Sequence, residues 1–334
     1  MRRVKARVVI VAALGLALAL YFIGFVGVGA VFSAAATVGW GGFAILCLYY
    51  LGLFPLLGTA CWVLLPDGSR SRVRVFVWAR MVRDAATDVL PFSQLGGLAL
   101  GARAAILEGV RRPVAFASLI VDVTAEMLAQ IPYIACGLAI LCVRAPRTSA
   151  AASLTVICIM GLALAVAAGA LFLALQRYGH GLIGKFALRL LPAAAAATAG
   201  VGDTLDAIYR SRARVALSAA LHFGGWIASA AGAWIAFRLI GSHADLASVV
   251  AIESLVGAAR SAAVIIPHAL GVQEAAYALL APLFGVGAEF GLAVSLLKRA
   301  RDIAVGLPIL LIWQAVEGRR ALAAGLEGDG IDRL

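Results

Sequence analysis

Long, unbroken apolar runs are the feature that most constrains the fold of this chain. Runs such as residues 8–31, 40–65 and 114–142 are each as long as the roughly 20 residues that a helix needs to cross a bilayer. An outer-membrane barrel would instead show segments of about ten residues with alternating polarity. The runs therefore predict an all-α, polytopic integral membrane protein, with a single transmembrane domain over residues 1–334.

The composition agrees with a membrane protein and argues against a separate water-soluble domain. Hydrophobic residues make up 63% of the 334 positions and charged residues 13%, whereas soluble domains have about 45–50% and about 25%. The five cysteines form no CxxC pair and the four histidines are scattered. We therefore predict no metal site and no cofactor, and the absence of P-loop, GxSxG and zinc motifs favours a protein that is not an enzyme.

Basic residues set the predicted orientation of the spans. The formal net charge is +11, from 28 Lys and Arg against 17 Asp and Glu, and no basic-aromatic pattern points to nucleic acid. Under the positive-inside rule the basic N-terminus, the 66–74 loop and the C-terminal arginines lie in the cytoplasm, so both termini are cytoplasmic. The first apolar run is longer than the apolar h-region of a signal peptide, which has about 7–15 residues, and it is expected to stay uncleaved. About six spans are predicted, at residues 8–31, 40–65, 114–142, 150–175, 215–238 and 289–315.

The 176–214 segment is the longest predicted cytoplasmic loop. It contains the basic, amphipathic string YGHGLIGKFALRLLP. Segments of this kind lie in the headgroup region of anionic leaflets. We therefore expect this loop to be interfacial and to contact anionic lipids of the inner leaflet.

Two charged apolar segments are interrupted by proline and glycine, which indicates broken helices. The predicted breaks are Pro91, Gly96, Gly97, Pro267 and Gly271. A straight crossing of the first segment would carry the arginines at 111–112 outside, against the charge bias. We therefore predict two re-entrant helical hairpins, the first entering from the cytoplasm and the second from outside.

The two hairpins form part of a predicted internal repeat. Pro91 and Pro132 are 41 residues apart, and so are Pro267 and Pro308, so that one offset of 176 residues superposes both pairs. Inverted repeats with broken helices are typical of secondary transporters. Coincidence in an alanine-rich chain is the alternative explanation. The repeat units are residues 73–143 and 249–319.

Ionisable residues inside apolar segments are the candidate site residues, because each costs about 2.5–3.5 kcal/mol to insert. Asp122, Glu126 and Gln130 follow an i, i+4, i+8 pattern that places them on one helix face. The half-helices that start after each break would direct their positive ends to a polar, central cavity. Alternatively, the charges are structural ion pairs. The candidate substrate-binding residues are Arg80, Arg83, Gln94, Arg103, Asp122, Glu126, Glu253, Arg260, Gln273, Glu274, Lys298, Arg301 and Asp302.

Four strings in these segments resemble a known family. They are WARMVRDAATDVLPFSQLGGLALGAR, VDVTAEMLAQ, ESLVGAARSAAVIIPHALGVQEAAYALL and LLKRARDIAVGLPILLIWQAVEGRR. Together they resemble the hopanoid-associated HpnL-type membrane proteins, which are similar to the transmembrane flippase region of lysylphosphatidylglycerol synthases. The resemblance implies a multi-pass, lipid-handling protein of the bacterial inner membrane.

The leading functional hypothesis is a flippase-like transporter that moves a polar-headed lipid, of hopanoid or phospholipid type, between leaflets. One alternative is a membrane transferase acting on lipid head groups, with Asp122 or Glu274 as base. Another is a non-transporting partner of hopanoid-modifying enzymes. The expected partners are a membrane lipid and hopanoid-pathway proteins, with no nucleic acid.

Overall fold

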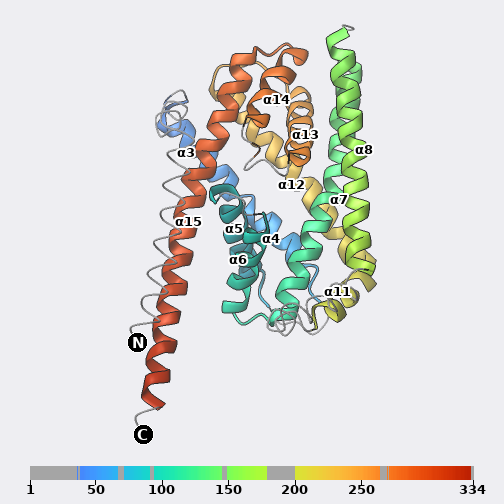
Figure 1. Ribbon diagram of the computed structural model, residues 1–334. Coiled ribbons are helices and arrows are strands. Elements are labelled where there is room, and N and C mark those ends of the chain that lie inside the picture. The colour runs from blue at the N-terminus through green and yellow to red at the C-terminus, as the bar shows by residue number, and fades with distance from the viewer. Residues whose placement is uncertain are drawn as a thin grey trace.

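The computed structural model describes residues 36, 38–66, 71–90, 94–144, 149–178, 200–263, 269 and 271–331, and all regular elements among them are helical (Figure 1). This confirms the predicted all-α class. The helices are α3 (Gly39–Leu51), α4 (Phe54–Trp62), α5 (Val73–Val89), α6 (Gln94–Leu107), α7 (Arg112–Arg144), α8 (Ser149–Tyr178), α11 (Val201–Arg210), α12 (Arg212–Leu239), α13 (Leu246–Ala262), α14 (Val272–Leu280), the 3₁₀ helix η2 (Ala281–Phe284) and α15 (Ala288–Ile331).

Three helical segments in the described part of the chain are long and apolar enough to cross a membrane. They are Gly39–Trp62, Arg112–Arg144 and Arg212–Leu239. Each coincides with a predicted span, which confirms that this is a membrane helical protein. The first predicted span, residues 8–31, lies outside the described residues.

Helices α5 and α6 form the first hairpin, and close approach of their backbones holds it together. A Cβ atom at Gly97 would lie 2.7 Å from the carbonyl oxygen of Arg83, and one at Gly101 would lie 3.0 Å from that of Ala79. The sequence pattern predicts Gly96 and Gly97 at the break itself. The structure instead places both inside α6, where the absence of a side chain at Gly97 allows helix packing.

Replacing Gly97 by leucine is expected to destabilise the protein by about 1–3 kcal/mol, because the new side chain would overlap the Arg83 backbone. Thermal unfolding of the purified protein in detergent measures the effect. Gly224→Ala is the matched control. Nothing lies within 4 Å of a Cβ at Gly224 on α12, so this change should be neutral or slightly stabilising. Equal melting temperatures for Gly97→Leu and the wild type would contradict the packing argument.

Contacts at the two ends of the bundle show that α7 and α15 run in opposite directions. At one end, Leu141 near the end of α7 lies in one cluster with Val286 and Val294 around the start of α15, and Arg144 donates to Asp245, the N-cap of α13, at 2.7 Å. At the other end, Arg320 of α15 donates to Glu108, which follows α6, at 2.9 Å. Since α6 leads into α7 and α14 leads into α15, the hairpins α5–α6 and α13–α14 start from opposite ends. Figure 1 shows α13 and α14 near one end of the bundle and α15 running past both hairpins.

The Asp245 cap ties the ends of α7 and α13 together. Its carboxylate also accepts from the backbone N–H of Ser248 at 3.1 Å. Partial burial raises the pKa of Asp245, but the hydrogen bonds from Ser248 and Arg144 outweigh it and lower the pKa to about 2. The carboxylate is therefore ionised at physiological pH and able to hold Arg144.

Helix α11 lies in the predicted 176–214 loop, of which residues 179–199 lie outside the described residues. The first and last residues of that loop belong to α8 and α12. The buried residues Val201, Leu205 and Ile208 of α11 pack in one cluster with Ala117 and Val121 of α7. The apolar face of this amphipathic helix is therefore turned to the protein.

Candidate functional site

A cavity of about 220 Å³ lies where α5, α7, α12, α13 and α15 meet. It has room for several water molecules or a small polar group. Charged side chains line it together with apolar ones from α4 and α15, such as Leu57 and Ile309. The charged lining residues are Arg80, Asp84, Asp88, Glu126, Arg260, Arg301 and Asp302.

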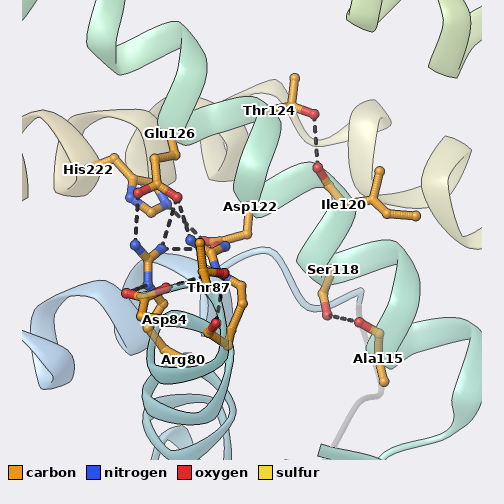
Figure 2. Close-up of polar contacts among 11 residues, drawn as sticks. Arg80, Asp84, Thr87, Ala115, Ser118, Ile120, Asp122, Thr124, Glu126 and His222 are labelled. Atoms are coloured by element: carbon orange, nitrogen blue, oxygen red, sulfur yellow. Dashed lines mark hydrogen bonds and ion pairs between the residues drawn. The ribbon is translucent and has the colours of Figure 1, made fainter. Parts of the chain in front are cut away.

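A buried ion-pair network forms one wall of this cavity. Arg80 and Arg83 are one turn apart on α5, and Asp122 and Glu126 are one turn apart on α7, so the two pairs face each other across the helix contact. Arg83 donates to Asp122 at 2.9 Å and to Glu126 at 2.6 Å. Arg80 donates to Glu126 at 2.8 Å and to Asp84 at 2.7 Å. Figure 2 shows these side chains converging.

His222 of α12 completes the network. Its Nε2 lies 2.8 Å from Oδ1 of Asp122, and both side chains are only 1% exposed. Since an ionised carboxylate only accepts, Nε2 carries the hydrogen. The other ring nitrogen, Nδ1, is buried and has no hydrogen-bond partner in the described part of the structure.

Two charged groups in the cavity stay without an ion pair. Asp88 of α5 and Arg260 of α13 both line it, and neither contacts a charged partner among the described residues. Arg301 pairs with Asp302 and lies 3.6 Å from the centre of the Tyr50 ring, yet its Nη1 is buried without a partner. Asp88 and Arg260 are half-buried at the cavity wall, and the Arg301 Nη1 is fully buried. Charge without a partner in an apolar interior is costly, so these groups are the ones a polar ligand would satisfy.

A second buried cluster lies between α13, α14 and α15. Lys298 donates to Glu253 at 2.6 Å and to the Tyr277 hydroxyl at 3.0 Å, and that hydroxyl donates to Glu253. On the same helices, Arg299 donates to Glu274 at 2.6 Å. None of these residues lines the cavity. They fit the alternative that some intramembrane charges are structural ion pairs.

The structure therefore divides the predicted site residues. Those brought to the cavity, directly or through the network, are Arg80, Arg83, Asp122, Glu126, Arg260, Arg301 and Asp302. Arg103 lies elsewhere, because it pairs with Glu317 at 2.8 Å and its side chain is 44% exposed. Gln273 donates to Ser295 at 2.9 Å. The other predicted residues placed away from the cavity are Glu253, Glu274 and Lys298. Pro91, Pro267, His268 and the side chain of Gln94 lie outside the described residues. Gly271 starts α14 with φ of +78°.

Sequence reasoning did not include His222, Asp84 or Asp88 among the site residues. His222 was treated as one of four scattered histidines. An available signal was its position inside an apolar run long enough to span a bilayer, where an ionisable residue is costly.

The side chains of Asp122, Glu126 and His222 offer ligand atoms that lie within 4.8 Å of one another, a spacing compatible with a metal ion. In this arrangement the guanidinium groups of Arg80 and Arg83 already bind both carboxylates. A divalent cation would have to displace two buried positive charges. The arrangement therefore favours an ion-pair network over a metal centre.

The comparison with protein families decides the class of this chain. Residues 6–309 match the family described as the lysylphosphatidylglycerol synthase TM region. The chain belongs to this family. The match includes the first predicted span and the central loop, which the four resembling strings leave out. No curated protein and no solved structure matches the chain. Membership of the lysylphosphatidylglycerol synthase TM region family confirms the broader resemblance seen in the sequence, and the hopanoid-associated HpnL type stays a prediction.

Proposed function

We propose that this protein moves a polar-headed lipid, of hopanoid or phospholipid type, between the leaflets of the bacterial inner membrane. The observation that carries the proposal is the cavity inside an apolar helical bundle, with Asp88 and Arg260 lining it and lacking an ion pair among the described residues. A head group with oxygen acceptors and a hydroxyl or amino group would satisfy both. The apolar lining residues, such as Leu57 and Ile309, suit the adjoining hydrocarbon.

The proposed architecture is a pair of inverted units with about six spans. An offset of 176 residues lays α5, α6 and α7 over α13, α14 with η2, and α15, with helix starts that agree to within about three residues. The opposite directions of α7 and α15 support the inversion. Broken-helix repeats that meet at mid-membrane are the architecture of alternating-access transporters.

The cavity lies where the two units face each other. Arg80 and Asp88 come from the first helix of one hairpin, and Arg260 comes from the first helix of the other. Rocking of one unit against the other would therefore change access to the same charged groups from either side. This is the arrangement that transport of a lipid head group requires.

Reconstitution tests the proposal. The purified protein is placed in liposomes that contain fluorescent phosphatidylglycerol, phosphatidylethanolamine or a labelled hopanoid, and reduction by external dithionite reports leaflet exchange. We expect protein-dependent exchange of at least one lipid. Exchange no faster than in protein-free liposomes for all three would contradict transport. A new covalent product from the labelled lipid would instead favour the transferase.

A further inference from the structure

We infer that His222 is a proton-binding site whose occupancy is coupled to head-group binding in the cavity, an inference that rests on the proposed lipid transport. The first step is the position of the imidazole. His222 lines the cavity, its Nε2 is held by Asp122, and its Nδ1 is buried without a partner among the residues that the structure describes. The hydrogen bond to Asp122 thus fixes the ring at Nε2, and Nδ1 is available to bind a proton.

The charge balance around His222 supplies the second step. The groups that line the cavity or bind its lining are four guanidinium groups and five carboxylates, so with all five carboxylates ionised the set is electroneutral when His222 carries a proton. Uncompensated charge in an apolar interior is costly. The arginines are Arg80, Arg83, Arg260 and Arg301, and the acids are Asp84, Asp88, Asp122, Glu126 and Asp302.

No helix packed around α12 supplies another charged group to this balance among the described residues. The remaining titratable side chains that these helices place near the cavity, the network or α12 include Tyr49 and Tyr50 of α3, Cys61 of α4, Tyr133 of α7 and Tyr209 of α11, which are uncharged in their ordinary states. Lys298 and Glu253 neutralise each other in the second cluster. A proton on His222, or one on Asp88 beside Asp84 and Asp302, closes the balance, and replacing His222 distinguishes the two sites.

Protonation also changes the chemistry that the cavity offers. In the neutral ring, with hydrogen on Nε2, Nδ1 is an acceptor, and in the imidazolium it is a donor. A negatively charged head group adds one more negative charge to the cavity and needs donors. Its binding is thus favoured when His222 is protonated, and bound anionic lipid in turn favours the proton.

Two more buried polar atoms mark a route for the proton. The Ser218 hydroxyl and the Trp226 Nε1 also lack partners in the part of the chain that the structure describes, and they lie one helical turn to either side of His222 on the same face of α12. Buried polar atoms of this kind are normally satisfied by ordered water. Water along this face would connect His222 with the cavity at Trp226, which also lines it.

The pH profile of leaflet exchange tests the inference in liposomes with fluorescent phosphatidylglycerol, with the same pH on both sides. For the wild type we expect exchange at least about tenfold faster at about pH 5 than at about pH 8. His222→Gln keeps a donor for Asp122 but cannot be protonated, and its exchange rate should not vary with pH. His243→Gln removes an exposed histidine outside the cavity, so this control should keep the wild-type profile. A pH-independent wild type, or a His222→Gln variant with the wild-type profile, would overturn the coupling.

A second variant covers the case in which His222→Gln does not fold. Asp84→Asn removes one carboxylate, so the balance closes without a proton on His222, and the half-maximal rate should move to lower pH. An unmoved profile overturns the inference. In addition, ¹⁵N-histidine NMR of the wild type should show an imidazolium signal for His222, assigned as the signal that persists when His180, His243 and His268 are replaced. In Asp84→Asn this signal should disappear at lower pH. This signal is measured even if no lipid is exchanged. Absence of exchange with a titrating His222 would contradict transport alone, and a ring that does not titrate would contradict the proton site.

Discussion

Replacing Arg83 by methionine is expected to destabilise the protein by about 3–5 kcal/mol, as for other buried ion pairs that lose one partner. Arg83 binds Asp122 at 2.9 Å and Glu126 at 2.6 Å, and Asp122 is 1% exposed. Methionine fills a similar volume but leaves these carboxylates with less compensation. Thermal or chemical unfolding in detergent measures the loss.

The matched control is the same substitution, arginine to methionine, at Arg103 on α6, the second helix of the α5–α6 hairpin. Arg103 pairs with Glu317 at 2.8 Å, but its side chain is 44% exposed, so water screens the pair. Arg103→Met should therefore cost no more than about 1 kcal/mol. If Arg83→Met and Arg103→Met lowered the free energy of unfolding equally, the buried α5–α7 network would contribute no more to stability than the exposed pair.

A double variant separates charge from packing. Glu126→Gln removes one of the carboxylates that Arg83→Met leaves undercompensated. The double variant Arg83→Met/Glu126→Gln should recover at least about 1 kcal/mol relative to the sum of the single changes. If the effects of the two single changes on the free energy of unfolding were strictly additive, Arg83→Met would destabilise by poor packing of the methionine side chain and not by the lost charge.

Replacing Arg260 by glutamine is expected to slow leaflet exchange by about 10–100-fold, because a hydrogen bond to a charged group contributes about 1.5–3 kcal/mol. Stability should change by less than about 1 kcal/mol, since no ion-pair partner in the described structure loses its counter-charge. The liposome assay and thermal unfolding measure the two effects separately.

Arg238→Gln is the control for Arg260→Gln. Arg238 lies in the last turn of α12, over the Trp234 ring at 5.2 Å, and does not line the cavity. Its removal should leave the exchange rate within about twofold of the wild type. Wild-type exchange by Arg260→Gln would remove Arg260 from the binding site.

Helix positions and helix faces were largely predictable from the sequence. The predicted spans at 114–142 and 215–238 coincide with α7 and α12 to within a few residues. The i, i+4, i+8 pattern placed Asp122, Glu126 and Gln130 on one face, and Gln130 indeed donates to Ser261 of α13 at 3.0 Å. These features follow from local periodicity and hydrophobic length, which a single helix already determines.

The assignment of charges to roles was not predictable. Glu253 and Arg260 lie on the same helix and were given the same predicted role. Packing brings Glu253 to Lys298, so that it forms a buried pair, and leaves Arg260 at the cavity. His222 was missed for the same reason, because its partner Asp122 is 100 residues away in the chain.

The sequence by itself determined the membrane-embedded, all-helical class and which side chains share a helix face, because both depend on spacing along one helix. Only the tertiary structure decided which charges neutralise one another and which stay available in the cavity. Ion pairing depends on distances of about 3 Å between groups on different helices, and those distances are set by how the helices pack.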